Sequence, residues 1–249
     1  MKALRLAALF AVVLLLSGCF SGSVIVSGIG QRKVVADGNM VTREYPAENF
    51  DKLSLAAPID VEFVQTDSLS KVEITASQNV IPLFEVKSSG SELSISMQNS
   101  QFRSLSLGEV SAKVYSPSIK GMYVAGAGSI TSSSVKTPKL EITVAGSGDV
   151  AVKNLEADRV NADIAGSGDI EASGRFGETF CSVEGSGDID LDGTYGRISA
   201  SVAGSGDIKL YGVSKSASIG IRGSGVVDIS GLKYESLTKD VHGSGGIMK

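Results

Sequence analysis

The C-terminal half of the chain alternates apolar and polar residues around one short glycine phrase. Seven copies of this phrase occur at intervals of 19 or 20 residues, beginning at Gly126, Gly146, Gly166, Gly185, Gly204, Gly223 and Gly243. An aliphatic residue stands two positions before the first glycine of every copy and four positions after it. A period of two with β-branched residues on one side is typical of a half-buried strand, and no window shows the apolar stripe of a helix. Each repeat therefore predicts a strand, a glycine corner, a strand and a second corner.

Strands that recur at one short interval can close only if each coil stacks on the one before it. The predicted fold class is all-β: a parallel β-helix, or solenoid, with coils of 19–20 residues. Neighbouring coils are expected about 4.8 Å apart, with ladders of aliphatic side chains inside.

The glycines of the repeated phrase are predicted to be structural, because a sharp corner between stacked coils leaves little room for a Cβ atom. These corner glycines are Gly126, Gly128, Gly146, Gly148, Gly166, Gly168, Gly185, Gly187, Gly204, Gly206, Gly223, Gly225, Gly243 and Gly245.

Residues 41–120 lack the repeated phrase but contain short alternating segments separated by Pro, Ser, Asp and Gly. These predicted strands are Lys52–Leu55, Ile59–Gln65, Lys71–Ala76, Phe84–Lys87, Glu92–Met97 and Val110–Tyr115. They are either degenerate coils of the same β-helix or a β cap on its end, and we favour degenerate coils. Residues 41–249 are therefore predicted to form one domain, with degenerate coils over 41–120 and regular coils over 121–249.

The N-terminus has the features of an export signal. Two basic residues precede the eleven apolar residues 6–16, which are too few to span a bilayer. The tetrad Leu-Ser-Gly-Cys that ends at Cys19 resembles the lipobox of bacterial lipoproteins. This resemblance implies a signal peptide over 1–18, cleavage before Cys19, and acylation that anchors Cys19 in a membrane. Residues 19–40 are then the lipidated N-terminus and a tether.

Phe20 follows this cysteine in place of the Asp that favours retention at the inner membrane in enteric bacteria. The expected location is therefore that of an exported outer-membrane lipoprotein, with its body facing either the periplasm or the cell surface.

The charge of the chain argues against nucleic-acid binding, and its cysteine content argues against an internal disulfide. Removal of Lys2 and Arg5 with the signal changes the net charge from −4 to −6, and the basic residues form no run. An acidic surface repels phosphate backbones, so nucleic-acid binding is not expected. With Cys19 lipidated, Cys181 stands alone in the exported chain, which excludes an intramolecular disulfide.

The most suggestive polar feature is an aspartate column in four consecutive copies of the phrase, at Asp149, Asp169, Asp188 and Asp207. The Gly-Ser-Gly-Asp phrase is similar to the Gly-x-Gly-x-Asp pattern of calcium-binding nonapeptide repeats, but the period here is 19 to 20 residues and not nine. The favoured interpretation is that each carboxylate accepts hydrogen bonds from N–H groups of its own tight corner. We therefore expect no bound metal and no cofactor, with calcium at this column as the weaker alternative.

Other candidate residues have structural explanations. Cys181 occupies an apolar column and is expected to be a buried, inert thiol. His242 has no second histidine with which to form a metal pair or a triad. Phe176, Tyr195 and Tyr234 share one position in the repeat and form either platforms for sugar rings or the cover of a hydrophobic seam. No set of acid, base and nucleophile emerges, so no catalytic residue is assigned.

The last coil presents a further expectation. A β-helix end leaves an unpaired strand edge, which must be covered, charged or paired with another molecule. Lys239 in an inward column and Lys249 partly blunt this edge. Self-association through the ends of the β-helix is therefore predicted.

Taken together, these segments resemble a known bacterial family. The run from Arg43 to Leu53, the strand Ile59–Glu62, the strand Ser91–Ile95 and the tandem Ala-Gly-Ser-Gly-Asp-Ile coils are similar to the family called putative auto-transporter adhesin, head GIN domain. The similarity extends over 41–249. It implies a right-handed parallel β-helix on an exported protein or lipoprotein, without assigned catalytic residues.

The functional hypothesis is a non-enzymatic, lipid-anchored cell-envelope β-helix that acts as an adhesin-like interaction scaffold. Its expected partners are the membrane through the lipid anchor, a second copy, and an unidentified envelope or surface ligand. The alternatives are a periplasm-facing component for envelope assembly or sensing, and a carbohydrate-active β-helix enzyme.

Overall fold

A computed structural model describes residues 32–67, 69–98 and 102–249. Residues Arg32–Lys249 form one compact unit. Cys19, the predicted signal over 1–18 and the tether up to residue 31 lie outside the described residues. No helix in the described part of the chain is long and apolar enough to cross a membrane.

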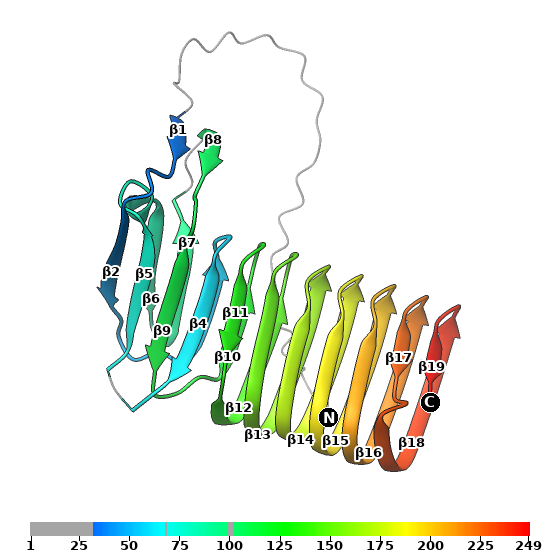
Figure 1. Cartoon of the computed structure of the whole chain (residues 1–249). Helices are drawn as coiled ribbons and strands as arrows, with labels where there is room; N and C mark the ends of the chain where they lie inside the picture. The colour runs from blue at the N-terminus through cyan, green and yellow to red at the C-terminus, as the bar shows by residue number, and fades with distance from the viewer. Residues whose placement is uncertain (1–31, 68, 99–101) are drawn as a thin grey trace, which may run out of the picture. The chain divides into compact units, whose positions relative to one another are not determined.

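Residues from Gly121 onward form a parallel β-solenoid, and the whole solenoid has about six turns (Figure 1). Every strand of this region up to Asp228 pairs in parallel with the strand one coil further on, and the last two strands pair with the coil before them. The strands are β10 (Gly121–Val124), β11 (Ser129–Ser132), β12 (Val135–Val144), β13 (Asp149–Gly166), β14 (Ile170–Gly185), β15 (Ile189–Gly204), β16 (Ile208–Gly223), β17 (Val226–Asp228), β18 (Leu232–Gly243) and β19 (Gly246–Met248). The predicted coil of 19–20 residues is confirmed.

Each coil has two faces joined by two different corners. The Gly-Ser-Gly corner interrupts the strands, whereas the second corner is a bend inside a continuous strand such as β14 or β15 (Figure 1). We call the face that leads into the Gly-Ser-Gly corner the leading face and the face that leaves it the trailing face. A long strand therefore runs down the trailing face, around the second corner, and up the leading face of the next coil.

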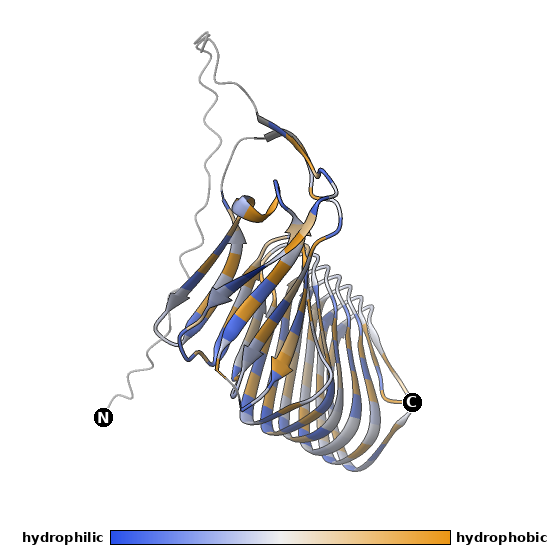
Figure 2. Ribbon diagram, turned by 60° about the vertical axis from the view of Figure 1, so that its left-hand side comes forward, coloured by the Kyte–Doolittle hydropathy of each residue, from blue (hydrophilic) through white to orange (hydrophobic). Residues whose placement is uncertain are grey.

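The alternation of the sequence places the aliphatic side chains in stacked interior columns. Figure 2 shows the corresponding apolar positions as orange bands along the ribbons. Val150 pairs with Ile170, which pairs with Ile189, which pairs with Ile208, and each of these side chains is buried. Burial of such a side chain contributes about 1.5–3 kcal/mol. The repeated columns supply the cohesion of a fold that has no internal disulfide among its described residues.

The six strands predicted upstream are present, but their arrangement is not a simple series of coils. They are β3 (Lys52–Ala56), β4 (Asp60–Gln65), β5 (Lys71–Ser77), β6 (Phe84–Ser89), β7 (Glu92–Met97) and β9 (Ser111–Ser116), with β2 (Met40–Pro46) before them and the short 3-10 helix η1 (Ile81–Leu83) before β6. Strands β3 and β4 pair in parallel with β10 and β11, and β7 and β9 pair in parallel with β3 and β4. These four strands behave as coils.

Strands β2, β5 and β6 contradict the prediction of degenerate coils, because they pair antiparallel with their neighbours. The reason is clearest at β6 and β7. Only Gly90 and Ser91 separate these strands, and such a short connection closes a hairpin but cannot make a parallel crossover. Gly90 has a positive φ of 59°, as a tight hairpin turn requires. The N-terminal end of the solenoid is therefore closed by antiparallel strands, which was the less favoured alternative.

Strands β1 (Arg32–Val35) and β8 (Phe102–Ser106) form a separate two-stranded parallel sheet. Val34 in β1 is buried. Part of the segment predicted as a tether, 19–40, is therefore folded, because β8 offers it a pairing partner 70 residues away in the chain.

Candidate functional site

The aspartate column forms a hydrogen-bonded ladder that crosses the coils. The backbone N–H of Asp169 donates a hydrogen bond to Oδ1 of Asp149 at 3.0 Å. In the same way, the N–H of Asp188 donates to Asp169 and the N–H of Asp207 donates to Asp188, each at 2.9 Å. The backbone N–H of Val226 donates to Asp207 at 2.7 Å and continues the series in a coil that lacks the aspartate.

This ladder corrects the predicted hydrogen bonds of the column. Each carboxylate accepts a hydrogen bond from a backbone N–H of the next coil and not from one in its own corner. The reason is that the backbone N–H of each aspartate points toward the coil before it. Among the described residues, no three His, Cys, Asp or Glu side chains converge in a way that would hold a metal ion. The observed role of the column is to connect coils.

The two outer glycines of the repeated phrase have different steric roles, which Gly166 and Gly168 illustrate. Gly166 has a positive φ of 158°, and a Cβ atom on it would lie 2.2 Å from the carbonyl oxygen of Gly146. Gly168 has no unusual φ, but its Cβ would lie 1.9 Å from the carbonyl oxygen of Gly148. The coils therefore approach so closely at this corner that a side chain at either position would force them apart.

The remaining chemical candidates do not converge. Cys181 is 3% exposed and lies in the interior column between Ala162 and Ala200. Burial raises the pKa of its thiol to about 12, so the reactive thiolate is not formed at neutral pH. His242 is exposed on β18, with its Nδ1 atom 3.2 Å from the carboxylate of Asp240.

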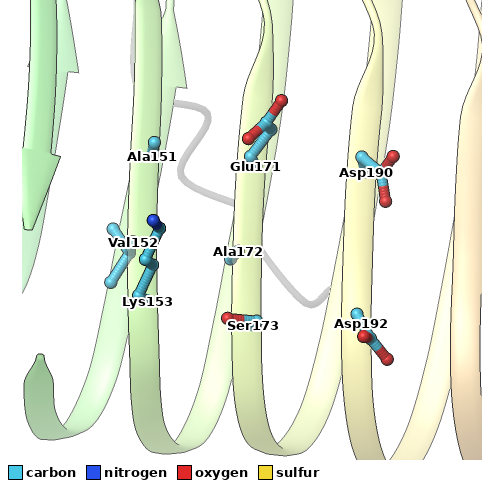
Figure 3. Close-up of a pocket in the computed structure, with 8 residues that line it drawn as sticks. All are labelled: Ala151, Val152, Lys153, Glu171, Ala172, Ser173, Asp190 and Asp192. Atoms are coloured by element: carbon cyan, nitrogen blue, oxygen red, sulfur yellow. The ribbon is translucent and has the colours of Figure 1, made fainter. Parts of the chain in front are cut away.

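The trailing face carries an acidic patch around a shallow depression of about 250 Å³ (Figure 3). Glu171, Asp190 and Asp192 project from neighbouring coils, and Lys153 lies on the coil before them. Partial burial raises the pKa of Asp190; nearby Lys209 opposes this effect, and the surrounding carboxylates add to it. The lining of this depression is therefore more acidic than basic, with three carboxylates and one lysine.

The second corner contains features that the sequence reasoning missed. The motif Gly-x-x-Gly recurs there at Gly174–Gly177 and Gly193–Gly196, 19 residues apart. This interval was the available signal. Between these glycines, Phe176 and Tyr195 lie 1% and 2% exposed, with ring centroids 5.1 Å apart. Both rings therefore cover the hydrophobic seam and are not exposed platforms, whereas Tyr234 is 36% exposed.

Two adjoining depressions of about 330 and 350 Å³ follow this corner across the coils, and we call them together the corner groove. The first is lined by Glu156, Asp158, Arg175, Phe176, Gly177 and Gly196. The second is lined by Val213, Ser214, Lys233, Tyr234 and Glu235. Thr194, Tyr195 and Lys215 belong to both, so the two depressions are continuous.

The hollow at the first depression arises from two glycines on adjacent coils. The strand register places Asp158, Gly177, Gly196 and Lys215 at successive positions along the corner. A Cβ on Gly177 would lie 2.0 Å from the carbonyl oxygen of Asp158, so packing requires this glycine. A Cβ on Gly196 would lie 3.1 Å from its closest neighbour, the carbonyl oxygen of Gly177, so a side chain there needs a backbone shift of a few tenths of an ångström.

The fold agrees with that of solved structures over nearly the whole described chain. A crystal structure of a putative lipid binding protein from Parabacteroides distasonis ATCC 8503 aligns with a TM-score of 0.78 and 26% identity, covering 88% of this chain and 100% of that one. A putative adhesin from Bacteroides fragilis NCTC 9343 aligns with a TM-score of 0.78 and 21% identity, covering 86% and 99%. A putative adhesin from Parabacteroides distasonis ATCC 8503 aligns with a TM-score of 0.66 and 22% identity, covering 87% and 99%. The sequence matches no curated protein.

A family model matches residues 49–232 and, in a second alignment, 181–248. These two ranges include the N-terminal coils β3 and β4, the closing antiparallel strands β5 and β6, and nearly all of the regular coils. The resemblance inferred from the N-terminal segments and the tandem coils is therefore confirmed, and the chain belongs to the family described as "Putative auto-transporter adhesin, head GIN domain".

Proposed function

We propose that this chain is a non-enzymatic, lipid-anchored β-solenoid of the bacterial cell envelope that acts as an adhesin-like interaction scaffold. The observation that carries the proposal is membership of the head GIN domain family together with a solenoid whose interior is filled by aliphatic columns. In such a fold the outward side chains are free to specify a ligand, because packing constrains only the inward ones.

The environments of the candidate reactive groups support a binding role over a catalytic one. The Cys181 thiol is buried and protonated, and the Asp149, Asp169, Asp188 and Asp207 carboxylates accept structural hydrogen bonds. The lipid anchor rests on the lipobox that ends at Cys19.

The experiment that tests the proposal is protease treatment of intact cells, followed by detection of the protein body with an antibody. Cleavage in intact cells, with a periplasmic marker protein left uncut, is the expected result. Protection until the outer membrane is opened would contradict an adhesin-like role and favour a periplasm-facing assembly or sensing component. Replacement of Cys19 by Ser should release the protein from the membrane fraction.

We further propose that two copies associate through the β18 and β19 end of the solenoid. Strand β18 pairs with β16 and β19 with β17, and no other strand among the described residues covers their outer edges. Val241 on β18 is 43% exposed, whereas Ile221 in the same column one coil earlier is fully buried. Exposed edges and apolar side chains favour pairing with another chain.

Charge at this end sets the conditions for such association. The Lys249 side chain lies beside Lys239, and this second positive charge lowers the pKa of Lys239. Association is therefore expected to increase with ionic strength, as light scattering at several protein and salt concentrations would show. A monomer at every concentration and salt level would contradict it.

A further inference from the structure

The corner groove combines an apolar wall, at Val213 and Tyr234, with a balanced set of charges. Its lining includes three acidic side chains, Glu156, Asp158 and Glu235, and three basic ones, Arg175, Lys215 and Lys233. The groove thus has no net charge, in contrast to the acidic trailing face beside Asp190. Neutrality makes the groove a poor trap for a polyanion or a polycation, because neither would gain from a complementary field.

Several polar groups around the groove are free to bind a ligand. The carboxylate of Glu156 is already paired with Lys136 at 3.0 Å and with Arg175 at 3.7 Å. By contrast, the side chains of Asp158, Lys215 and Lys233 have no hydrogen-bond or ion-pair partner among the described residues, and the same holds for the side chains of Thr194 and Glu235. The groove therefore offers unpaired donors and unpaired acceptors side by side.

Apolar surface that a ligand can reach lies beside these polar groups. Val213, which is 51% exposed, and Tyr234, which is 36% exposed, supply it in the second depression, whereas Phe176 and Tyr195 are buried beneath the groove. Aromatic and aliphatic surface beside convergent polar groups is the usual composition of a small-molecule site. A pyranose ring matches this composition, because it has apolar C–H faces and hydroxyl groups that both donate and accept hydrogen bonds.

The spacing of the coils favours a linear glycan over an extended peptide. Neighbouring coils repeat about every 4.8 Å along the groove. Side chains on one side of an extended peptide recur only about every 6.6 Å, because successive residues advance 3.3 Å and alternate in direction. The monosaccharide repeat of a linear pyranose chain is close to the coil spacing, so one sugar can face each coil.

We propose that the corner groove binds a neutral, linear oligosaccharide, with Asp158 and Glu235 accepting from its hydroxyl groups and Lys215 and Lys233 donating to them. This proposal rests on the adhesin-like function and names the ligand class of that scaffold. Gly196 is the determinant that keeps the first depression open, since a Cβ there would meet its neighbour at 3.1 Å, a far milder contact than the 2.0 Å at Gly177.

The test is isothermal titration of the full exported chain, purified in detergent, with cellotetraose, maltotetraose, laminaritetraose and chitotetraose. Tetragalacturonate and a Glu-rich peptide serve as the anionic glycan and the peptide control. Saturable binding of at least one neutral tetrasaccharide is expected. Gly196→Leu should weaken it at least about tenfold, which corresponds to about 1.4 kcal/mol.

Gly220→Leu is the matched control, because Gly220 lies on the leading face and a Cβ there would have no neighbour within 4 Å. This variant should bind as the wild type does. If Gly196→Leu fails to fold, Lys215→Met and Asp158→Asn replace it as the test, because they leave the backbone packing unchanged. Each of them should weaken binding. Chromatography of the sugar after incubation should show no shortened product.

Three results would overturn the proposal: no saturation by any neutral tetrasaccharide, binding of only the anionic glycan or the peptide, or equal affinity of Gly196→Leu and Gly220→Leu. Each of these leaves the protease result on intact cells unchanged, so failure of the ligand assignment is distinguishable from failure of the proposed function. Shortened sugar would instead identify a carbohydrate-active enzyme.

Discussion

Replacement of Asp188 by Ala or by Asn separates the hydrogen bond of the aspartate ladder from its charge. The Asp188 carboxylate accepts the backbone N–H of Asp207 at 2.9 Å, in a partly buried position. Alanine removes the acceptor and leaves this N–H without its partner. Asparagine keeps an oxygen at the same place but removes the negative charge.

Two opposing effects decide the outcome. A hydrogen bond to a charged group contributes about 1.5–3 kcal/mol and one to a neutral group about 0.5–1.5 kcal/mol. Against this, carboxylates at a coil spacing of about 4.8 Å repel each other by about 0.9 kcal/mol in water, and physiological salt reduces the repulsion by roughly half. Asp188 has two such neighbours, Asp169 and Asp207, so loss of its charge relieves about 1 kcal/mol of repulsion.

Asp188→Asn is therefore expected to be nearly neutral, because the weaker hydrogen bond and the relieved repulsion offset each other. Asp188→Ala loses the whole bond and should destabilise the protein by about 1 kcal/mol, which lowers the melting temperature by about 2–4 °C. The assay is thermal unfolding followed by circular dichroism, with and without EDTA and with added calcium.

Equal loss of stability in both variants would refute this reasoning, because it would show that the charge and not the acceptor is needed. A large fall in the wild-type melting temperature in EDTA, reversed by calcium, would identify the column as a metal site. Unchanged melting in EDTA is the expected result.

Three further predictions concern packing, pH and reactivity. Gly187→Ala should lower the melting temperature far more than Gly196→Ala. The Cβ at position 187 would lie 2.0 Å from a backbone oxygen, whereas the Cβ at position 196 would lie 3.1 Å from one. Equal effects in thermal unfolding would contradict the steric argument. Burial, reinforced by nearby glutamates, raises the pKa of Asp163 above its ordinary 3.8. Between the unfolded and the folded pKa the native state binds more protons than the unfolded state, so the protein loses stability as pH rises through this range. Asp163→Asn should therefore stabilise the protein at pH 7 but not below about pH 3.8 in urea titrations. Cys181 should react with iodoacetamide only after unfolding, and labelling of the native protein would show that its column opens.

Much of the regular solenoid could be predicted from the sequence, because its information is local and repeated. The aliphatic residues Val150, Ile170, Ile189 and Ile208 recur at the coil interval, and stacking equivalent positions on one another buries all of these side chains at once. A shift of register by one residue would expose every column, so the period alone determines the coil length and the inward face. The corner glycines recur in the same way.

The N-terminal strands could be located from the sequence but not arranged. Strands β3 and β4 pair with β10 and β11, about 70 residues further on, while the chain between them forms another coil and the closing strands β5 and β6. Without a repeated phrase, several pairings of such short strands satisfy the same alternation. Long-range packing against the first regular coil decides among them.

The candidate site depended even more on tertiary structure. The aspartates were evident in the sequence, but only the approach of neighbouring coils determines that Asp188 accepts the N–H of Asp207 and not one in its own corner. Likewise, the repeat indicates that Phe176 and Tyr195 are equivalent, yet only packing shows that both rings are buried and that Gly177 and Gly196 lie side by side in the corner groove. The period of the sequence determined what stacks, whereas contacts between coils determined which surfaces remain open to a ligand.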